Sequence, residues 1–190
     1  MRALAVNHQN DFRVKAYAGT NGVLLAMDVA EPRRKGLLGF AIEKQQGSKP
    51  WQFLFNSLTF PGKTHTFPQY HATPSNIAPL QKFRWADYAV SPGLTIQYRV
   101  YLAYGSADAP QLGESLEVTV TSDDGHPGNQ SVNFNRAVAA SQAFQRKFPE
   151  LDALLGGKER LPLESWPDAP RRWLENGLLG RLLGFIERAV

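Results

Sequence analysis

The longest regular pattern in this sequence is an alternation of apolar and polar side chains over residues 94–104. Apolar or aromatic side chains stand at every second position, namely Leu94, Ile96, Tyr98, Val100, Leu102 and Tyr104. A period of two is typical of a long antiparallel strand with one buried face. Residues 116–121 alternate in the same way, so we expect a hairpin in which Leu116, Val118 and Val120 also face the core.

Five shorter segments with strand character come before this hairpin, at residues 13–18, 23–29, 37–43, 51–55 and 81–88. Asn21-Gly22 is a strong turn signal between the first two. Residues 23–29 form a short, largely apolar run, which predicts a strand buried on both faces. Residues 60–79 contain four prolines and predict a long irregular loop.

About seven strands joined by turns rich in Pro and Gly predict a mainly β fold. The expected architecture is a β-sandwich that resembles immunoglobulin or fibronectin type III modules. The chain has no cysteine, so the disulfide of immunoglobulin domains is absent and the fibronectin-like version is favoured. We expect this module to span residues 1–128.

The period changes in the remaining part of the chain, residues 129–190, where we expect a helical appendage. Residues 133–148 have helical periodicity and Pro149 follows them, while residues 156–170 hold three prolines and predict a linker. The last segment has an apolar stripe at helical spacing, made of Leu178, Leu182, Phe185 and Ile186. We expect this helix to dock on a catalytic domain C-terminal to Val190, or on a partner chain, including a second copy in a homodimer.

Charge is distributed unevenly along the 190 residues, which carry a net charge of +4. Residues 1–90 hold 11 Lys and Arg against 5 Asp and Glu. Such an excess can favour phosphate-bearing partners, so weak contact with nucleic acid or anionic lipid is expected; the alternative is an ordinary basic surface. The sequence shows neither a secretory signal nor a transmembrane segment, and a cytoplasmic location is expected.

Three adjacent cations, Arg33, Arg34 and Lys35, lie between two predicted strands and are the candidate phosphate or partner contact. A solvated hairpin tip is the alternative. Aromatic residues cluster in the following segment, at positions Trp51, Phe53, Phe55, Phe60 and Phe67. Aromatic rings with cations can form a stacking site for single strands, although in a β-module such rings more often belong to the core.

Motifs that would carry catalysis or hold a metal are absent. The chain has no Gly-x-Ser-x-Gly segment and no P-loop. Its histidines are His8, His65, His71 and His126, and the pair His65 and His71 lacks a third ligand nearby in the sequence. We therefore expect no metal, no cofactor and no catalytic residue.

Six segments resemble the N-terminal, non-catalytic region of bacterial phospholipase D-like proteins. They are VKAYAGT at 14–20, LLGFAIE at 37–43, QKFRWADY at 81–88, YRVY at 98–101, FNRAVAASQAF at 134–144 and WLENGL at 173–178. Their order spans most of residues 13–190. The family's catalytic signature is His-x-Lys-x-x-x-x-Asp, in which a His attacks phosphorus and the Lys neutralises phosphoryl charge. None of the four histidines here has Lys two positions later.

The resemblance implies an accessory domain of a phosphodiesterase, which would brace the catalytic domain or position a phosphodiester substrate. An independent β-sandwich that binds a protein or a glycan is the alternative. A phosphodiesterase with an unrecognised site is the third hypothesis, and the missing motif makes it the weakest.

Overall fold

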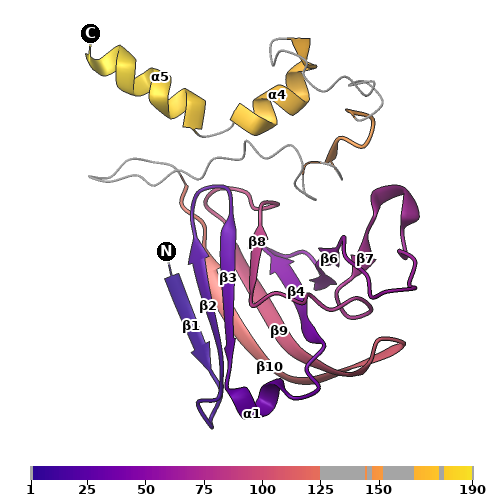
Figure 1. Ribbon diagram of the computed structural model, residues 1–190. Coiled ribbons are helices and arrows are strands. Elements are labelled where there is room, and N and C mark those ends of the chain that lie inside the picture. Colours follow the sequence, from indigo (N-terminus) through magenta and orange to yellow (C-terminus); the bar gives the residue numbers. More distant parts are fainter. Residues whose placement is uncertain (1, 125–143, 145–146, 152–164, 176–177, 190) are drawn as a thin grey trace.

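A computed structural model describes residues 2–124, 144, 147–151, 165–175 and 178–189. Two four-stranded antiparallel sheets form most of it (Figure 1). One sheet has the order β1-β2-β3-β8, with β1 Arg2–Val6, β2 Phe12–Ala18, β3 Val23–Val29 and β8 Arg84–Asp87. The other has the order β10-β9-β4-β5, with β10 Ala109–Thr121, β9 Thr95–Ser106, β4 Gly39–Gln46 and β5 Gln52–Phe53. The predicted mainly β fold is confirmed.

The two sheets share one hydrophobic core. Its largest fully buried side chains come from both sheets, among them Phe12 and Leu25 from the first and Phe40, Ile42 and Tyr98 from the second. The predicted hairpin is confirmed, because β9 and β10 pair antiparallel with Val100 opposite Leu116. Most inward positions of that hairpin belong to the core as expected, with Tyr98, Val100, Leu102, Val118 and Val120 buried and Leu116 packed against them. Leu94, predicted on the same face, precedes β9 and is exposed.

The prediction that residues 23–29 are buried on both faces is wrong. Val23, Leu25, Met27 and Val29 are buried, but Leu24 and Asp28 on the other face are exposed. The outer face of an antiparallel sheet commonly remains in contact with water. One face of this strand belongs to the core, and Leu24 is an apolar residue on the face toward solvent. The apolar run therefore does not indicate that a second layer covers the strand.

The segment between β5 and β8 is irregular, as its prolines predict. It contains the short pair β6 Phe55–Asn56 and β7 Thr73–Pro74, and a 3₁₀ turn η1 at Pro68–Tyr70. Ser75 attaches it to β4, since the Ile42 amide donates to Ser75 Oγ (3.0 Å) and this hydroxyl donates to the Ile42 carbonyl oxygen (3.2 Å). The connection between β3 and β4, which carries Arg33, Arg34 and Lys35, contains a short helix, α1 Glu31–Arg34.

Two helices are described near the C-terminus, α4 Asp168–Glu175 and α5 Leu178–Ala189. Asp168 stabilises the first turn of α4 through ion pairs with Arg171 (3.0 Å) and Arg172 (3.1 Å). Trp173 and Leu174 join Phe144, Phe148 and Leu151 in a second apolar cluster, against which Tyr88 and Trp166 pack. No described helix is long and apolar enough to cross a membrane.

Several predictions fall on residues that the structure does not describe. These include the module boundary at residue 128, most of the predicted helix at 133–148 and most of the predicted linker at 156–170. Within the linker range, α4 already begins at Asp168, with Pro170 in its first turn, where proline is tolerated.

Candidate functional site: a basic cleft between two edge strands

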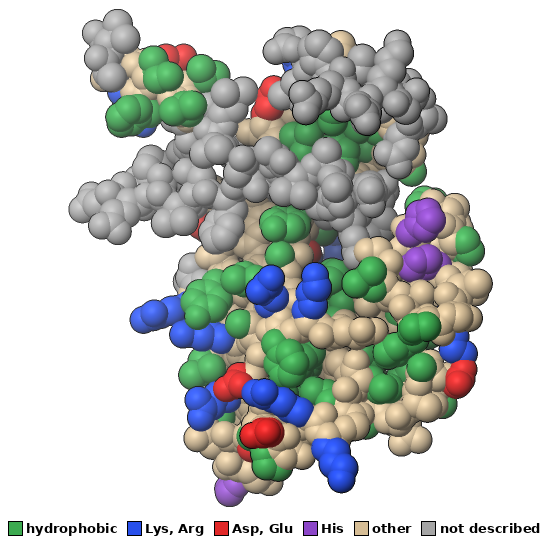
Figure 2. Space-filling view, in the orientation of Figure 1, with side chains coloured by type: hydrophobic (Ala, Val, Ile, Leu, Met, Phe, Trp, Pro, Cys, Tyr) green, Lys and Arg blue, Asp and Glu red, His purple; other side chains and the backbone are tan. Residues whose placement is uncertain are grey.

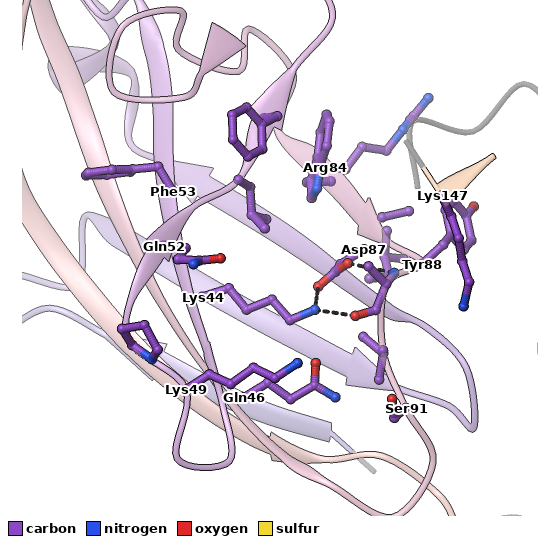
Figure 3. Close-up of a pocket in the computed structure, with 18 of the residues that line it drawn as sticks. Lys44, Gln46, Lys49, Gln52, Phe53, Arg84, Asp87, Tyr88, Ser91 and Lys147 are labelled. Atoms are coloured by element: carbon purple, nitrogen blue, oxygen red, sulfur yellow. Dashed lines mark hydrogen bonds and ion pairs between the residues drawn. The ribbon is translucent and has the colours of Figure 1, made fainter. Parts of the chain in front are cut away.

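A cleft of about 950 Å³ opens on the side of the sandwich where the sheets end in β5 and β8. One wall comes from β4, the following turn and β5, and includes Lys44, Lys49 and Phe53 (Figure 3). The other wall comes from β8 and residues 88–91, and Lys147 and Trp173 complete the lining. Because both strands are edges, side chains from the two faces of β8 can reach the same space.

The floor of the cleft is an ion pair that joins the two sheets. Lys44 Nζ lies 2.6 Å from Asp87 Oδ2 and donates to the Ala89 carbonyl oxygen, also at 2.6 Å. The Tyr98 hydroxyl donates to the same carboxylate oxygen at 2.8 Å. Burial raises the pKa of Tyr98 well above its ordinary value, and the neighbouring Asp87 charge raises it further. Asp87 is therefore fully engaged by protein groups.

Four further cations line the cleft, and they are Lys49, Lys82, Arg84 and Lys147. All four side chains are exposed. Within the described part of the chain, none of them lies within ion-pair distance of a carboxylate. In Figure 3, Arg84 and Lys49 lie on either side of the Lys44–Asp87 pair. The cleft thus carries positive charge that is available to an anionic ligand.

Aromatic rings also line the cleft. Phe53, Phe55, Trp85 and Tyr88 are half-buried, and Trp173 is buried with its ring centroid 5.5 Å from that of Phe144. Trp85 packs against the main core and Tyr88 packs against the second apolar cluster, so packing contacts restrict the orientation of both rings. The space-filling view shows Lys and Arg side chains on this face of the molecule, with hydrophobic side chains exposed among them (Figure 2).

Arg33, Arg34 and Lys35, the predicted phosphate contact, do not line this cleft. A terminal nitrogen of Arg33 lies 2.7 Å from both Asp11 Oδ1 and Glu114 Oε2. Arg34 donates from Nε to the Val29 carbonyl oxygen (2.6 Å), and its guanidinium lies 5.3 Å from the Phe83 ring centre. Lys35 is exposed. Their contact with phosphate stays a prediction, but two of the three already have protein partners.

The guanidinium of Arg33 also affects the acid beside it. Its hydrogen bond is the main cause that lowers the pKa of Asp11, and a hydrogen bond from Asn7 Nδ2 (2.7 Å) lowers this pKa further. The hydrogen bonds of Arg33 with Asp11 and with Glu114 raise the pKa of Arg33 above its ordinary range.

The five aromatic residues that the sequence places together are divided by the fold. Phe53 and Phe55 line the cleft, and Phe53 also contacts Tyr101 on the outer face of the second sheet. Trp51 lies on that outer face with Arg99 4.5 Å from its ring centre. Phe67 contacts Phe55 with ring centroids 5.7 Å apart. The interpretation of these rings as core is wrong, since none of the five is buried. Four of them are half-buried and Phe67 is exposed.

The histidine pair lies in the irregular segment. The rings of His65 and His71 are 5.7 Å apart, and His65 Nδ1 is 3.3 Å from Thr73 Oγ1; Figure 2 shows two adjacent histidines on the surface. Among the described residues, no group of three or more His, Asp or Glu side chains is placed to hold a metal. His8 is exposed, and His126 lies outside the described residues.

Five residues of the cleft were not predicted from the sequence, namely Lys49, Lys82, Arg84, Trp85 and Tyr88. A usable signal exists in residues 82–85, where two cations alternate with Phe83 and Trp85 just before and within the short strand β8. The local pattern does not show that β8 is the edge strand of its sheet or that β5 is the edge strand of the other sheet. Strand order depends on pairing between distant segments.

No protein-family model matches this chain, and no curated protein matches it. The resemblance to phospholipase D-like proteins therefore rests on the sequence segments alone.

Proposed function

We propose that this chain is a non-catalytic β-sandwich module that holds a phosphodiester-bearing ligand in the cleft between β5 and β8. It would do so as an accessory domain of a phospholipase D-like phosphodiesterase. The observation that carries the proposal is the convergence of Lys49, Lys82, Arg84 and Lys147 on one cleft. The one described carboxylate in its lining is already neutralised by Lys44. Lys and Arg are the groups that bind backbone phosphates in most protein–nucleic acid contacts.

A binding role fits this cleft better than catalysis. Among the described residues that line it there is no histidine, the residue that phospholipase D-like chemistry uses as nucleophile. Asp87 accepts from Lys44 and Tyr98 and is not free to act as a base. We expect no turnover of a chromogenic phosphodiester, and activity that persists through two purification columns would contradict this.

Strand order supports the fibronectin-like part of the proposal. Strands β2, β3 and β8 are neighbours in one sheet, and β10, β9, β4 and β5 follow one another in the other. In immunoglobulin-like sandwiches, strands A, B and E are neighbours, as are G, F, C and C′. The seven strands match that scheme in sequence order, and β1 would be an addition at the edge of β2.

The last helix supplies a surface for the partner. Leu182, Leu183, Phe185 and Ile186 on α5 are each half or more exposed. Burying one such side chain stabilises a complex by about 1.5–3 kcal/mol, before ordering costs are subtracted. We propose that α5 docks on a catalytic domain or on a second copy. The double change Leu182→Lys and Phe185→Lys should then abolish any dimer in sedimentation while the far-ultraviolet circular dichroism of the sheets persists.

Binding to an abasic deoxyribose-phosphate oligomer tests the cleft, because that probe offers phosphodiesters without bases. The triple variant Lys49→Ala, Lys82→Ala, Arg84→Ala should weaken binding at least tenfold in fluorescence anisotropy at low salt. A matched control removes three cations from the outer face of the first sheet, as Arg2→Ala, Arg13→Ala, Lys15→Ala. Equal loss in both variants would mean that net charge, and not the cleft, holds the ligand.

A glycan-binding module is the second candidate, and the outer face of the second sheet favours it. Phe53 and Tyr101 lie there with ring centroids 6.2 Å apart, and the Tyr101 hydroxyl donates to Glu43 at 2.8 Å. Rings flanked by polar groups on a flat sheet suit the apolar face of a sugar. Saturable binding of a neutral oligosaccharide that is lost in Tyr101→Ala, but not in the cleft triple variant, would support this candidate.

A further inference from the structure

We propose that the cleft takes single-stranded nucleic acid, and that unpaired bases stack on Trp85 and Tyr88 while the cations hold the backbone. This inference rests on the proposed function, because it names the ligand for the same cleft. It adds a role for the aromatic rings, which a site for phosphate alone does not need.

The rings are presented as stacking surfaces require. Trp85 is half-buried, with the main core packed against it, and still lines the cleft. Tyr88 is half-buried against the second apolar cluster and lies near Lys147 in Figure 3. A ring supported by protein on one side loses little conformational freedom when a base covers the other side. Base–aromatic stacking tolerates any sequence, because every base has a flat π-face.

Two cations and one ring lie close together in sequence along the wall that carries Trp85. Lys82, Arg84 and Trp85 line the cleft and both cations are exposed, whereas Phe83 contacts Phe40 and lies outside the lining. Successive side chains on a strand point to opposite faces. At the edge strand β8 the cation Arg84 and the ring of Trp85 therefore reach the cleft from the two faces of the sheet. An extended single strand offers the complementary arrangement, with phosphates along one side and bases along the other.

Other phosphodiester ligands match the cleft less well. A duplex keeps its bases stacked on each other, so the rings would have no partner. A lipid would require an enclosed apolar channel for its acyl chains, whereas the floor of this cleft is the charged pair Lys44 and Asp87. A single phosphate is small compared with a cleft of about 950 Å³ whose cations come from both sheets and the C-terminal segment.

The decisive experiment compares three fluorescein-labelled probes by anisotropy with the full chain. They are a twelve-nucleotide oligothymidylate, an abasic oligomer of the same charge and a twelve-base-pair duplex. We expect oligothymidylate to bind at least about tenfold more tightly than the abasic oligomer. Tyr88→Ala and Trp85→Ala should each remove most of that advantage while binding of the abasic oligomer is unchanged. Tyr17→Ala, an aromatic change on the outer face beside Lys15, is the matched control and should have no effect.

Because Trp85 packs against the core, its Ala variant can fail to fold. Photo-crosslinking of the unmodified protein to a bromodeoxyuridine strand avoids this difficulty, and mass spectrometry should place the crosslinks at Trp85 or Tyr88. Equal affinity for oligothymidylate and the abasic oligomer, or for the duplex and the single strand, would overturn this inference. If the cleft triple variant still lost abasic binding, the proposed function would stand. If no probe bound, both would fail.

Discussion

Two basic regions of this molecule use their charge differently. At the α1 end of the sandwich, Arg33 contacts Asp11 and Glu114, and Arg34 lies over Phe83 and 3.8 Å from Asp28. In the cleft between β5 and β8, four exposed cations have no carboxylate within ion-pair distance among the described residues. Arg33 and Arg34, which are adjacent in the sequence, make contacts that stabilise the fold. The four cleft cations are mostly distant from one another in the sequence, and they lie where a ligand can reach them.

The α1 end shows how such charge is used internally. Asn7 accepts from the backbone amides of Asp11 and Phe12 (3.0 Å each) and donates to the Asp11 carboxylate. Arg33 then links this turn to Glu114 on β10, and the Tyr104 hydroxyl donates to the Arg33 carbonyl oxygen at 2.9 Å. The network closes one end of the sandwich, so its cations are structural.

The largest expected effect comes from the buried ion pair under the cleft. Asp87→Ala leaves Lys44 charged, 12% exposed and without its carboxylate, and removes the acceptor of the Tyr98 hydroxyl. Breaking a buried pair by removing one partner typically costs about 3–5 kcal/mol. We expect the free energy of unfolding, measured by urea denaturation, to fall by about that amount. The control is Asp28→Ala. The Asp28 side chain is 66% exposed, so its pairing with Arg34 should contribute less than about 1 kcal/mol.

A second variant separates the unpaired charge from the loss of packing. In the double change Lys44→Met, Asp87→Leu, both charges are replaced by apolar groups, so much of the lost stability should return. If Asp87→Ala denatures at the same urea concentration as the parent, the pair does not join the sheets in the way described. The distinction between a Lys44–Asp87 pair that stabilises the fold and exposed cleft cations that are open to a ligand would then fail.

The sequence was sufficient for features that depend on local periodicity. The alternation over residues 94–104 correctly placed Tyr98, Val100 and Leu102 in the core, and the matching alternation placed Val118 and Val120. The strand β1 was missed, because only five residues pair there with β2 and their alternation is weak. The formation of β1 depends on pairing with β2, and the alternation of side chains within β1 does not predict it.

The candidate site depended on information that no local pattern contains. The run Arg33, Arg34, Lys35 was conspicuous because its charges are adjacent, but its counterions Asp11 and Glu114 are distant in sequence. The cleft cations Lys49, Lys82 and Lys147 are separated by more than thirty residues from one another, and only the tertiary fold brings them to one cleft. Local spacing predicts secondary structure, whereas the availability of a charge depends on tertiary neighbours.

The next effect in size concerns the salt dependence of binding. For single strands, the logarithm of the association constant falls with log salt by about 0.7 for each phosphate neutralised. The triple change Lys49→Ala, Lys82→Ala, Arg84→Ala should therefore lower the magnitude of the slope for oligothymidylate by about 2. Lys35→Ala, an exposed cation at the α1 end, should leave the slope nearly unchanged. A similar reduction of the salt slope in the triple variant and in Lys35→Ala would mean that the cleft and the α1 end do not differ in how they contact the ligand.

A smaller effect is expected on stability at the α1 end. Arg33→Ala removes contacts to Asp11 and Glu114, but these side chains are between 26% and 37% exposed. Water then solvates the remaining carboxylates, so we expect a loss of about 1–2 kcal/mol, less than for Asp87→Ala. Urea denaturation of both variants side by side checks the order. The reverse order would mean that the α1 network, and not the cleft floor, is the stronger connection between the sheets.

The smallest expected effect is a dependence of stability on acid. Contacts with Arg33 and Asn7 lower the pKa of Asp11 in the folded protein below its unfolded value of about 3.9. A carboxylate whose folded pKa is depressed stabilises the fold above the unfolded pKa, and this contribution is lost as pH falls through the folded pKa. The free energy of unfolding should therefore decline below about pH 4 less steeply in Asp11→Asn than in the parent. Arg33→Ala should flatten the same part of the curve, because its guanidinium is the main cause of the shift, and the double variant should add nothing further. If Arg33→Ala kept the full acid dependence while Asp11→Asn lost it, the guanidinium would not be held by Asp11. Arg33 would then have to be grouped with the cleft cations as charge open to a ligand.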